Sequence, residues 1–386
     1  MRKHIFWIIG FLSLAFMGDR IGGFVLQKVT EKSQFRYSRL YNSNSDADIL
    51  FVGNSRGLTF YQPEVEKITS LNTMNLSYNG MPADLAKCLV MDYLDRHNPP
   101  KVMVVDITLC DRTNDVLKSG FNLYTINSFR IDTLLRGIKS PDDWAGRKIV
   151  YGGKVSWLYK HNSEIFQRVL YHYKKSDKDW LIDRVIGETA TTDTSFKSYQ
   201  VRMFPEMVGH LKEMIEYAKG KGVEVKLVIN PYFPAFAQTI RDSFLTPLKT
   251  AVEAQTGLTV TDYSTALTER DEIGDYQHAN KKGSIKYMQI LSSMGYFNSL
   301  KSNELGIILP QKEMGTSDKI SLDSLKSEPL SNEEISETIS PNKAKNINIS
   351  PVSVNFKDQK PPFKSFKKKK IKGNEGWYSV DTLFNE

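Results

Sequence analysis

Residues 48–56 read Asp-Ile-Leu-Phe-Val-Gly-Asn-Ser-Arg, a short apolar run followed by a turn that carries a serine. The run is shorter than a typical helix, and its side chains do not alternate between apolar and polar. This pattern is typical of a strand buried on both faces, as the strands of a parallel sheet are. Ser55 would then lie at the carboxyl end of the strand, where open α/β sheets bind their ligands.

The same pattern recurs between residues 46 and 300. We expect further strands at residues 73–76, 102–105, 223–229 and 258–260. Residues 82–94 and 207–218 carry apolar side chains at helical spacing. Strands that alternate with helices predict an α/β fold: a doubly wound, mostly parallel sheet flanked by helices.

Three regions differ from this pattern. Residues 1–27 place Arg2 and Lys3 before an apolar run, which is typical of an N-terminal membrane anchor or a signal and directs export of the downstream chain. We favour an uncleaved anchor, and a removed signal is the first alternative. A buried helix of a cytosolic domain is the second, because Asp19 and Arg20 interrupt the apolar run. The aromatic-rich residues 110–200 predict an inserted helical cap. The polar, lysine-rich residues 301–386 predict a disordered tail.

Composition argues against several classes of function. The chain of 386 residues has a net charge of +8, but its basic residues are interspersed with acidic ones and form no basic helix, so we expect no nucleic-acid partner. Cys88 and Cys110 lack metal-ligand spacing, and we read them as buried thiols, with a disulfide as the alternative. No phosphate-binding or dinucleotide-binding glycine motif follows a strand. We therefore expect no metal and no cofactor.

Three residues supply the chemistry of a serine hydrolase or acyltransferase. Ser55 offers a nucleophile, while Asp275 and His278 lie three residues apart in an expected loop near the end of the α/β domain. An imidazole can take the serine's proton, and a carboxylate can hold the imidazole in the required tautomer. If the fold brings them together, Ser55 and His278 should lie within hydrogen-bond reach, roughly 2.6–3.2 Å.

These segments resemble a known family. Gly53-Asn54-Ser55-Arg56, then residues 75–80 (Asn-Leu-Ser-Tyr-Asn-Gly), then Asp275 and His278 followed by Asn280 and Gly283 are similar to the first, second and last sequence blocks of the SGNH (GDSL-like) hydrolase superfamily. The resemblance covers roughly residues 46–295 and is nearest to membrane-anchored bacterial members that handle envelope or polysaccharide acyl groups. It implies a flavodoxin-like fold.

The resemblance also implies an oxyanion hole, formed by the backbone N–H groups of Ser55 and Gly80. The sequence departs from the family at the third block, where Gly-x-Asn-Asp is expected and Val105-Asp106-Ile107-Thr108 is found. Asn79 or Asn114 is a candidate for the missing side-chain donor.

Three functions remain open at this stage. The first is hydrolysis of O-acyl esters on an extracytoplasmic glycan or lipid by a membrane-anchored enzyme. The second is transfer of the acyl group to an envelope polysaccharide, for which a multi-span membrane partner would deliver the acyl donor. The third is a catalytically inactive SGNH-fold protein of envelope binding or assembly, which the altered third block favours.

Overall fold

The protein is described by a computed structural model that covers residues 2–138, 144–179, 181, 183–188 and 201–297. The tail expected at residues 301–386 lies outside the described residues, as do residues 139–143 and 189–200 of the expected insertion. Within the described part, Cys88 and Cys110 are buried free thiols.

In the described part, five parallel strands form the central sheet in the order β2-β1-β3-β4-β5. They are β1 (Ile49–Val52), β2 (Thr73–Asn75), β3 (Val102–Asp106), β4 (Glu224–Ile229) and β5 (Val260–Asp262). This is the flavodoxin-like order, in which the winding reverses between β1 and β3. The predicted fold class is confirmed. Of the five strands, only β5 is shifted from its predicted range, since it begins at residue 260, where the predicted strand (258–260) ends.

Both faces of the sheet are buried. Leu50 and Val52 of β1 pack into one hydrophobic core, whereas Ile49 and Phe51 pack into the other. The two-sided burial explains why the strand sequence shows no polar alternation.

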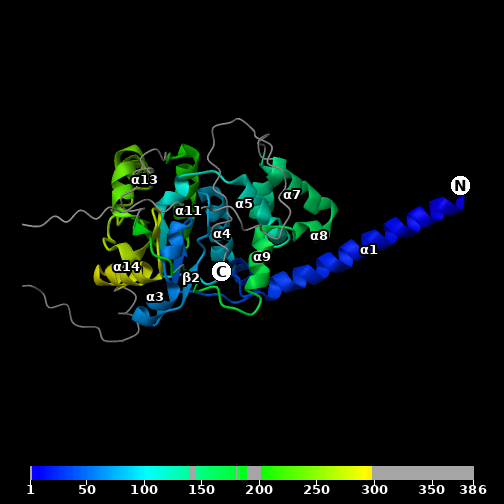
Figure 1. Cartoon of the computed structure of the whole chain (residues 1–386), viewed down its shortest axis with the longest axis horizontal. Helices are drawn as coiled ribbons and strands as arrows, with labels where there is room; N and C mark the ends of the chain where they lie inside the picture. Colours follow the sequence, from blue (N-terminus) through cyan, green and yellow to red (C-terminus); the bar gives the residue numbers. More distant parts are fainter. Residues whose placement is uncertain (1, 139–143, 180, 182, 189–200, 298–386) are drawn as a thin grey trace, which may run out of the picture. The chain divides into compact units, whose positions relative to one another are not determined.

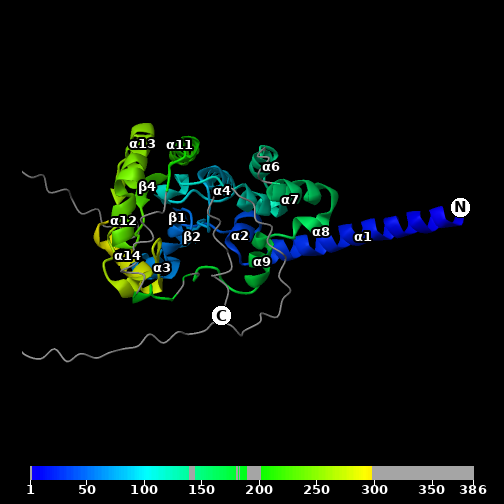
Figure 2. The ribbon, with the colours of Figure 1, turned by 45° about the horizontal axis from the view of Figure 1, so that its top comes forward.

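Helices cover the two faces (Figure 2). The predicted helices at residues 82–94 and 207–218 are present as α4 (Ala83–Arg96) and α11 (Pro205–Gly220), which pack against each other on one face. The same core is completed by α2 (Arg36–Asn42), α12 (Pro234–Ile240), the π-helix η5 (Arg241–Leu245) and α13 (Thr246–Thr256). The other face is covered by α3 (Gln62–Thr69) and α14 (Lys281–Ser293).

The described part of the insertion is helical, as predicted. It comprises α5 (Asp115–Gly120), η3 (Phe121–Tyr124), α6 (Phe129–Arg136), α7 (Trp144–Val155), α8 (Trp157–Lys160) and α9 (Glu164–Tyr171). Its contacts include α6 against α4, and α8 and α9 against the N-terminal helix. Figures 1 and 2 show α8 and α9 beside that helix, and α7 packs against α8.

The N-terminal helix α1 runs without a break from Arg2 to Lys32. Its residues from Lys3 to Gly18 are exposed, while Thr30 near its end is buried in the domain. Among the described helices, α1 has the length and apolar character to cross a membrane, and a signal sequence near an N-terminus has the same properties.

Candidate active site

The carboxyl ends of neighbouring strands meet around Ser55. This residue follows β1 and precedes the 3-10 helix η1 (Arg56–Thr59). Asn54 donates a side-chain hydrogen bond to Thr108 O after β3 (2.9 Å), and Asn230 after β4 donates one to Arg56 O (3.0 Å). These bonds fix the serine turn at the point where the sheet's winding reverses, which is the usual ligand site of this topology.

Asp275 and His278 do not lie in an irregular loop, as the sequence led us to expect. They lie on an antiparallel hairpin of β6 (Ile273–Asp275) and β7 (His278–Ala279), with a two-residue turn between them. The register pairs Asp275 directly with His278, so their side chains are cross-strand neighbours. The hairpin is tied to the domain by bonds from Ile186 N to Ile273 O (2.8 Å) and from Phe233 N to Tyr276 O (3.1 Å).

The three predicted residues form one hydrogen-bonded chain. His278 Nε2 lies 2.8 Å from Ser55 Oγ, and His278 Nδ1 lies 2.8 Å from Asp275 Oδ1. An ionised carboxylate only accepts hydrogen bonds, so the Nδ1 atom of a neutral His278 carries the proton and Nε2 accepts from the serine hydroxyl. The arrangement can therefore move a proton from Ser55 to His278.

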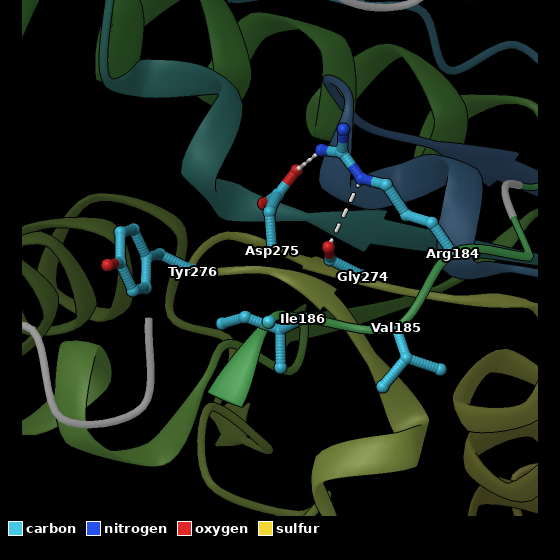
Figure 3. Close-up of a pocket in the computed structure, with 7 residues that line it drawn as sticks. Arg184, Val185, Ile186, Gly274, Asp275 and Tyr276 are labelled. Atoms are coloured by element: carbon cyan, nitrogen blue, oxygen red, sulfur yellow. Dashed lines mark hydrogen bonds and ion pairs between the residues drawn. The ribbon is translucent and has the colours of Figure 1, made fainter. Parts of the chain in front are cut away.

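Asp275 is held as a carboxylate by its surroundings. Its burial alone would raise the pKa, but the charge and hydrogen bond of His278, the N–H of Gln277 (2.9 Å) and Arg184 together hold the pKa of Asp275 well below its usual range. Figure 3 shows the Arg184 guanidinium turned toward this carboxylate, with Nη2 at 2.9 Å from Oδ2 and Nε donating to Gly274 O. The group is thus ionised at neutral pH.

A pocket of about 280 Å³ lies on the Arg184 side of Asp275 (Figure 3). Its lining consists of Arg184, Val185, Ile186, Gly187, Gly274, Asp275 and Tyr276. Asp275 is the member of the Ser55-His278-Asp275 chain that lines this pocket.

Buried Arg56 joins the serine turn to the hairpin. Its guanidinium donates to Gln277 Oε1 in the hairpin turn (3.0 Å), to Thr108 Oγ1 (2.9 Å) and to Asp111 Oδ2 (2.5 Å). Burial alone would raise the pKa of Asp111, but the charges of Arg56 and Arg112 hold it below the usual value. Arg56 directly follows Ser55, so its bond to Gln277 fixes the position of the hairpin turn relative to the serine turn.

The Gly80 segment has the conformation expected of a tight turn. Gly80 has φ +68°, and Met81 N donates to Tyr78 O (3.1 Å) across the turn. A positive φ at this position of the turn favours glycine. Within the described residues, neither the Ser55 N–H nor the Gly80 N–H donates a hydrogen bond to the protein. Both donors of the implied oxyanion hole are therefore open.

The two candidates for the missing donor differ. Asn114 Nδ2 donates to Gly80 O (3.0 Å), while Asn114 Oδ1 accepts from Leu117 N as the N-cap of α5. Asn114 thus stabilises the Gly80 turn by donating a hydrogen bond to the carbonyl oxygen of Gly80. Asn79 is half-buried and its side chain makes no hydrogen bond within the described part of the chain.

At the end of β3, Asp106 stands in the third block. Its Oδ1 accepts from the backbone N–H and hydroxyl of Thr108, within the 3-10 helix η2 (Ile107–Cys110), and burial raises its pKa. Its side chain therefore serves the local turn and supplies no amide donor.

Comparison with known proteins adds little to the fold and the site described above. No model of a protein family matches this chain, and no curated protein matches it. Among solved structures, the crystal structure of a "putative acylhydrolase" from Bacteroides fragilis is similar at 12% sequence identity and a TM-score of 0.32, covering 65% of this chain and 87% of that one. A likeness of this size carries no argument about function, so the fold assignment rests on the sheet order.

Sequence reasoning missed the residues that orient the hairpin. Arg184 lies 91 positions from Asp275, in a segment without a recognisable pattern. Gln277 stands between the two predicted residues, but nothing in the sequence pairs it with Arg56, 221 positions away.

A further helix, η6 (Arg270–Glu272), precedes the hairpin. Within the described part, no three histidine, cysteine or acidic side chains are grouped to hold a metal ion.

Proposed function

We propose that this protein is a serine-dependent ester hydrolase of the SGNH type that removes O-acyl groups from a glycan or lipid outside the cytoplasm. The observation that carries the proposal is the continuous hydrogen-bonded chain from Ser55 through His278 to Asp275. Both of its bonds are 2.8 Å long, and the carboxylate at its end is ionised.

In the first half of the reaction, Ser55 Oγ attacks the ester carbonyl carbon and its proton moves to His278 Nε2. The carbonyl oxygen becomes an oxyanion that the N–H groups of Ser55 and Gly80 stabilise. Each such donor contributes about 3–4 kcal/mol to the stability of the transition state. The bond to the leaving alcohol then breaks, and His278 returns the proton to the alcohol oxygen.

In the second half, a water molecule attacks the acyl-serine ester. His278 takes a proton from this water, the second oxyanion collapses, and the proton returns to Ser55 Oγ as the acid leaves. Asp275 remains ionised throughout. It accepts the hydrogen bond from His278 Nδ1–H and stabilises the imidazolium that forms twice per turnover.

The extracytoplasmic location rests on α1. Its exposed apolar surface matches a membrane anchor, and Arg2 and Lys3 at its beginning favour retention of that end in the cytoplasm. Asp19 and Arg20, which interrupt the apolar run, have partners in the folded domain, so the interruption does not exclude a membrane location. The α/β domain comes after the helix in the chain and would lie on the far side of the membrane.

Transfer to a sugar hydroxyl uses the same first half-reaction and differs in the nucleophile of the second. It would require an acyl donor, supplied by a multi-span membrane partner. The altered third block at Asp106 is the observation that favours the third candidate, a non-catalytic protein that retains the fold.

The test measures acetate release from an O-acetylated polysaccharide and from p-nitrophenyl acetate. We expect the wild type to turn over both, and Ser55→Ala and His278→Ala to lose the activity. Ser293→Ala, a serine at the end of α14, is the matched control and should retain it. Accumulation of acylated oligosaccharide in place of free acetate would identify transfer, and activity that survives Ser55→Ala would refute the serine mechanism.

A further inference from the structure

The exposed apolar surface of α1 extends past its charged pair. Ile5 to Met17 rise only about 18 Å along a helix, whereas the hydrocarbon core of a bilayer is about 30 Å thick. Beyond Asp19 and Arg20, the side chains of Ile21, Phe24 and Val25 are again more than half exposed. The stretch from Ile5 to Val25 rises about 30 Å, so a membrane-spanning α1 needs residues 21–25 in the lipid. Asp19 and Arg20 then lie within the hydrocarbon layer.

Both charged side chains have partners on the insertion. Asp19 accepts hydrogen bonds from the backbone N–H groups of Trp157 (2.9 Å) and Leu158 (3.2 Å) and from the Ser156 hydroxyl. Arg20 Nη2 donates to Val155 O at the end of α7 (3.0 Å). Charged side chains inside a membrane pair with one another or with backbone groups, as these do.

The insertion approaches α1 closely because α1 carries two glycines at the contact. A Cβ atom on Gly23 would lie 2.3 Å from Trp157 Cβ, and one on Gly22 would lie 2.8 Å from Leu158 Cδ2. A side chain at Gly23 would also lie 3.0 Å from the backbone carbon of Trp157 and would push α8 away from the helix, whereas one at Gly22 would displace the end of the Leu158 side chain. The contact is therefore a close-packed junction between α1 and the corner where α7 meets α8 (Figures 1 and 2).

The outer surface of this corner is apolar and aromatic. Tyr151 and Val155 lie one helical turn apart on α7 and are both strongly exposed, and Trp157 and Leu158 on α8 are also exposed. The Arg20 guanidinium stacks over the Trp157 ring at 5.3 Å, and Lys154 Nζ lies over the Tyr151 ring at 5.2 Å. Tryptophan and tyrosine are enriched where a protein meets the membrane interface. Long cationic side chains near helix ends extend to the same layer.

We propose that the corner of α7 and α8 enters the membrane beside α1 and covers Asp19 and Arg20 there. From residue 19 to residue 25, α1 rises about 9 Å, which places the corner at the depth reached by interfacial helices. Lipid, in this arrangement, contacts Tyr151, Val155, Trp157 and Leu158. The inference rests on the membrane anchoring of α1 proposed above, and it adds a second contact that fixes the orientation of the α/β domain on the membrane.

The test uses the full chain reconstituted into vesicles of phosphatidylcholine and phosphatidylglycerol. Single cysteines are introduced by Val155→Cys, by Phe11→Cys in the exposed part of α1, and by Met294→Cys at the end of α14. These side chains are 76%, 71% and 65% exposed, so the variants are matched in accessibility. Each is labelled with an environment-sensitive fluorophore and quenched with lipids carrying nitroxide on their acyl chains. The buried Cys88 and Cys110 are checked by labelling the wild type.

We expect strong quenching at Val155→Cys and Phe11→Cys, several-fold above that at Met294→Cys. Quenching at Phe11→Cys with Val155→Cys at the Met294→Cys level would overturn the proposal, since the corner would then face water or another protein. No quenching at Phe11→Cys would overturn it as well, because α1 would not be in the membrane. The measurement does not depend on activity, so it gives the same answer in a Ser55→Ala background and separates this inference from the enzymatic one.

Discussion

The substitution Asp275→Asn tests how the carboxylate controls the tautomer of His278. Asp275 Oδ1 accepts from His278 and from Gln277 N, while Oδ2 accepts from Arg184. An asparagine has one acceptor oxygen, so its amide nitrogen must face either His278 and Gln277 or Arg184. A guanidinium does not give up its proton, whereas an imidazole can shift its proton to the other nitrogen.

The charge-assisted bond to Arg184 decides between these two orientations. Hydrogen bonds to charged groups contribute about 1.5–3 kcal/mol, more than the about 0.5–1.5 kcal/mol of the bond from the Gln277 N–H that is lost, so the amide oxygen should turn toward Arg184 and the amide nitrogen toward His278. His278 Nε2 then carries the proton and cannot accept the one from Ser55. We expect Asp275→Asn to fold normally and to lose about 10⁴-fold in kcat, the size of loss that a wrong tautomer causes in serine proteases.

Arg184→Met removes the bias and provides the control. In the double variant the amide oxygen is free to face His278, so activity should recover about tenfold to a hundredfold relative to Asp275→Asn alone. Arg184→Met by itself should lose about tenfold or less, because the carboxylate remains. The assay is the initial rate of p-nitrophenyl acetate hydrolysis for the wild type and the three variants. Near-wild-type turnover by Asp275→Asn would remove Asp275 from the mechanism, and a double variant no faster than Asp275→Asn would refute the proposed amide orientation.

Three further predictions concern the Gly80 turn and the buried ion pair. Gly80→Ala forces a side chain onto a φ of +68° and places its Cβ 2.7 Å from Asn114 Nδ2, so the Gly80 N–H should be displaced from the oxyanion hole and kcat/KM should fall by about 10²-fold or more. Gly257→Ala, with a similar positive φ and open space around it, should cost only about 1 kcal/mol of stability; equal activity of the two in the ester assay would contradict this. Asp111→Asn leaves the Arg56 guanidinium buried without its counter-ion and should destabilise the protein by about 3–5 kcal/mol in urea unfolding, and a loss below about 1 kcal/mol would count against the ion pair. The folded-state pKa of Asp111 is lowered, so the stability that its carboxylate contributes is fully present above the unfolded pKa of about 3.9 and is lost as the pH falls from there through the folded-state pKa. The Tm of the wild type should therefore fall more steeply with acid than the Tm of Asp111→Asn. Parallel Tm curves would contradict the assigned shift.

The sheet could be predicted from the sequence because each strand is buried on both faces. Residues 49–52 are apolar at every position, and each side of β1 contacts a different core. The same logic placed Ser55 at the carboxyl end of the first strand. The hairpin of β6 and β7 escaped prediction because strands of three and two residues are too short to show a periodicity.

Contacts between distant segments could not be predicted either. Neither the bond from Arg56 to Gln277 nor that from Arg184 to Asp275 leaves a local signal, since each depends on how the chain returns to the site. Asn114 is different, because an asparagine followed by an aspartate and an apolar run is a common helix start, and its capping role was accessible from local chemistry. In the sequence, Asp19 and Arg20 only interrupt an apolar run. The structure shows that they bind partners at the end of α7 and the start of α8.

In the proposed mechanism, His278 and Asp275 activate Ser55 as a nucleophile. The most direct measurement is the intact mass of the protein after treatment with a fluorophosphonate, for the wild type, Ser55→Ala and His278→Ala, with circular dichroism confirming that each variant is folded. We predict a single adduct on the wild type and none on either variant. A folded wild type that takes up no adduct, or a Ser55→Ala variant that is still labelled, would contradict the claim.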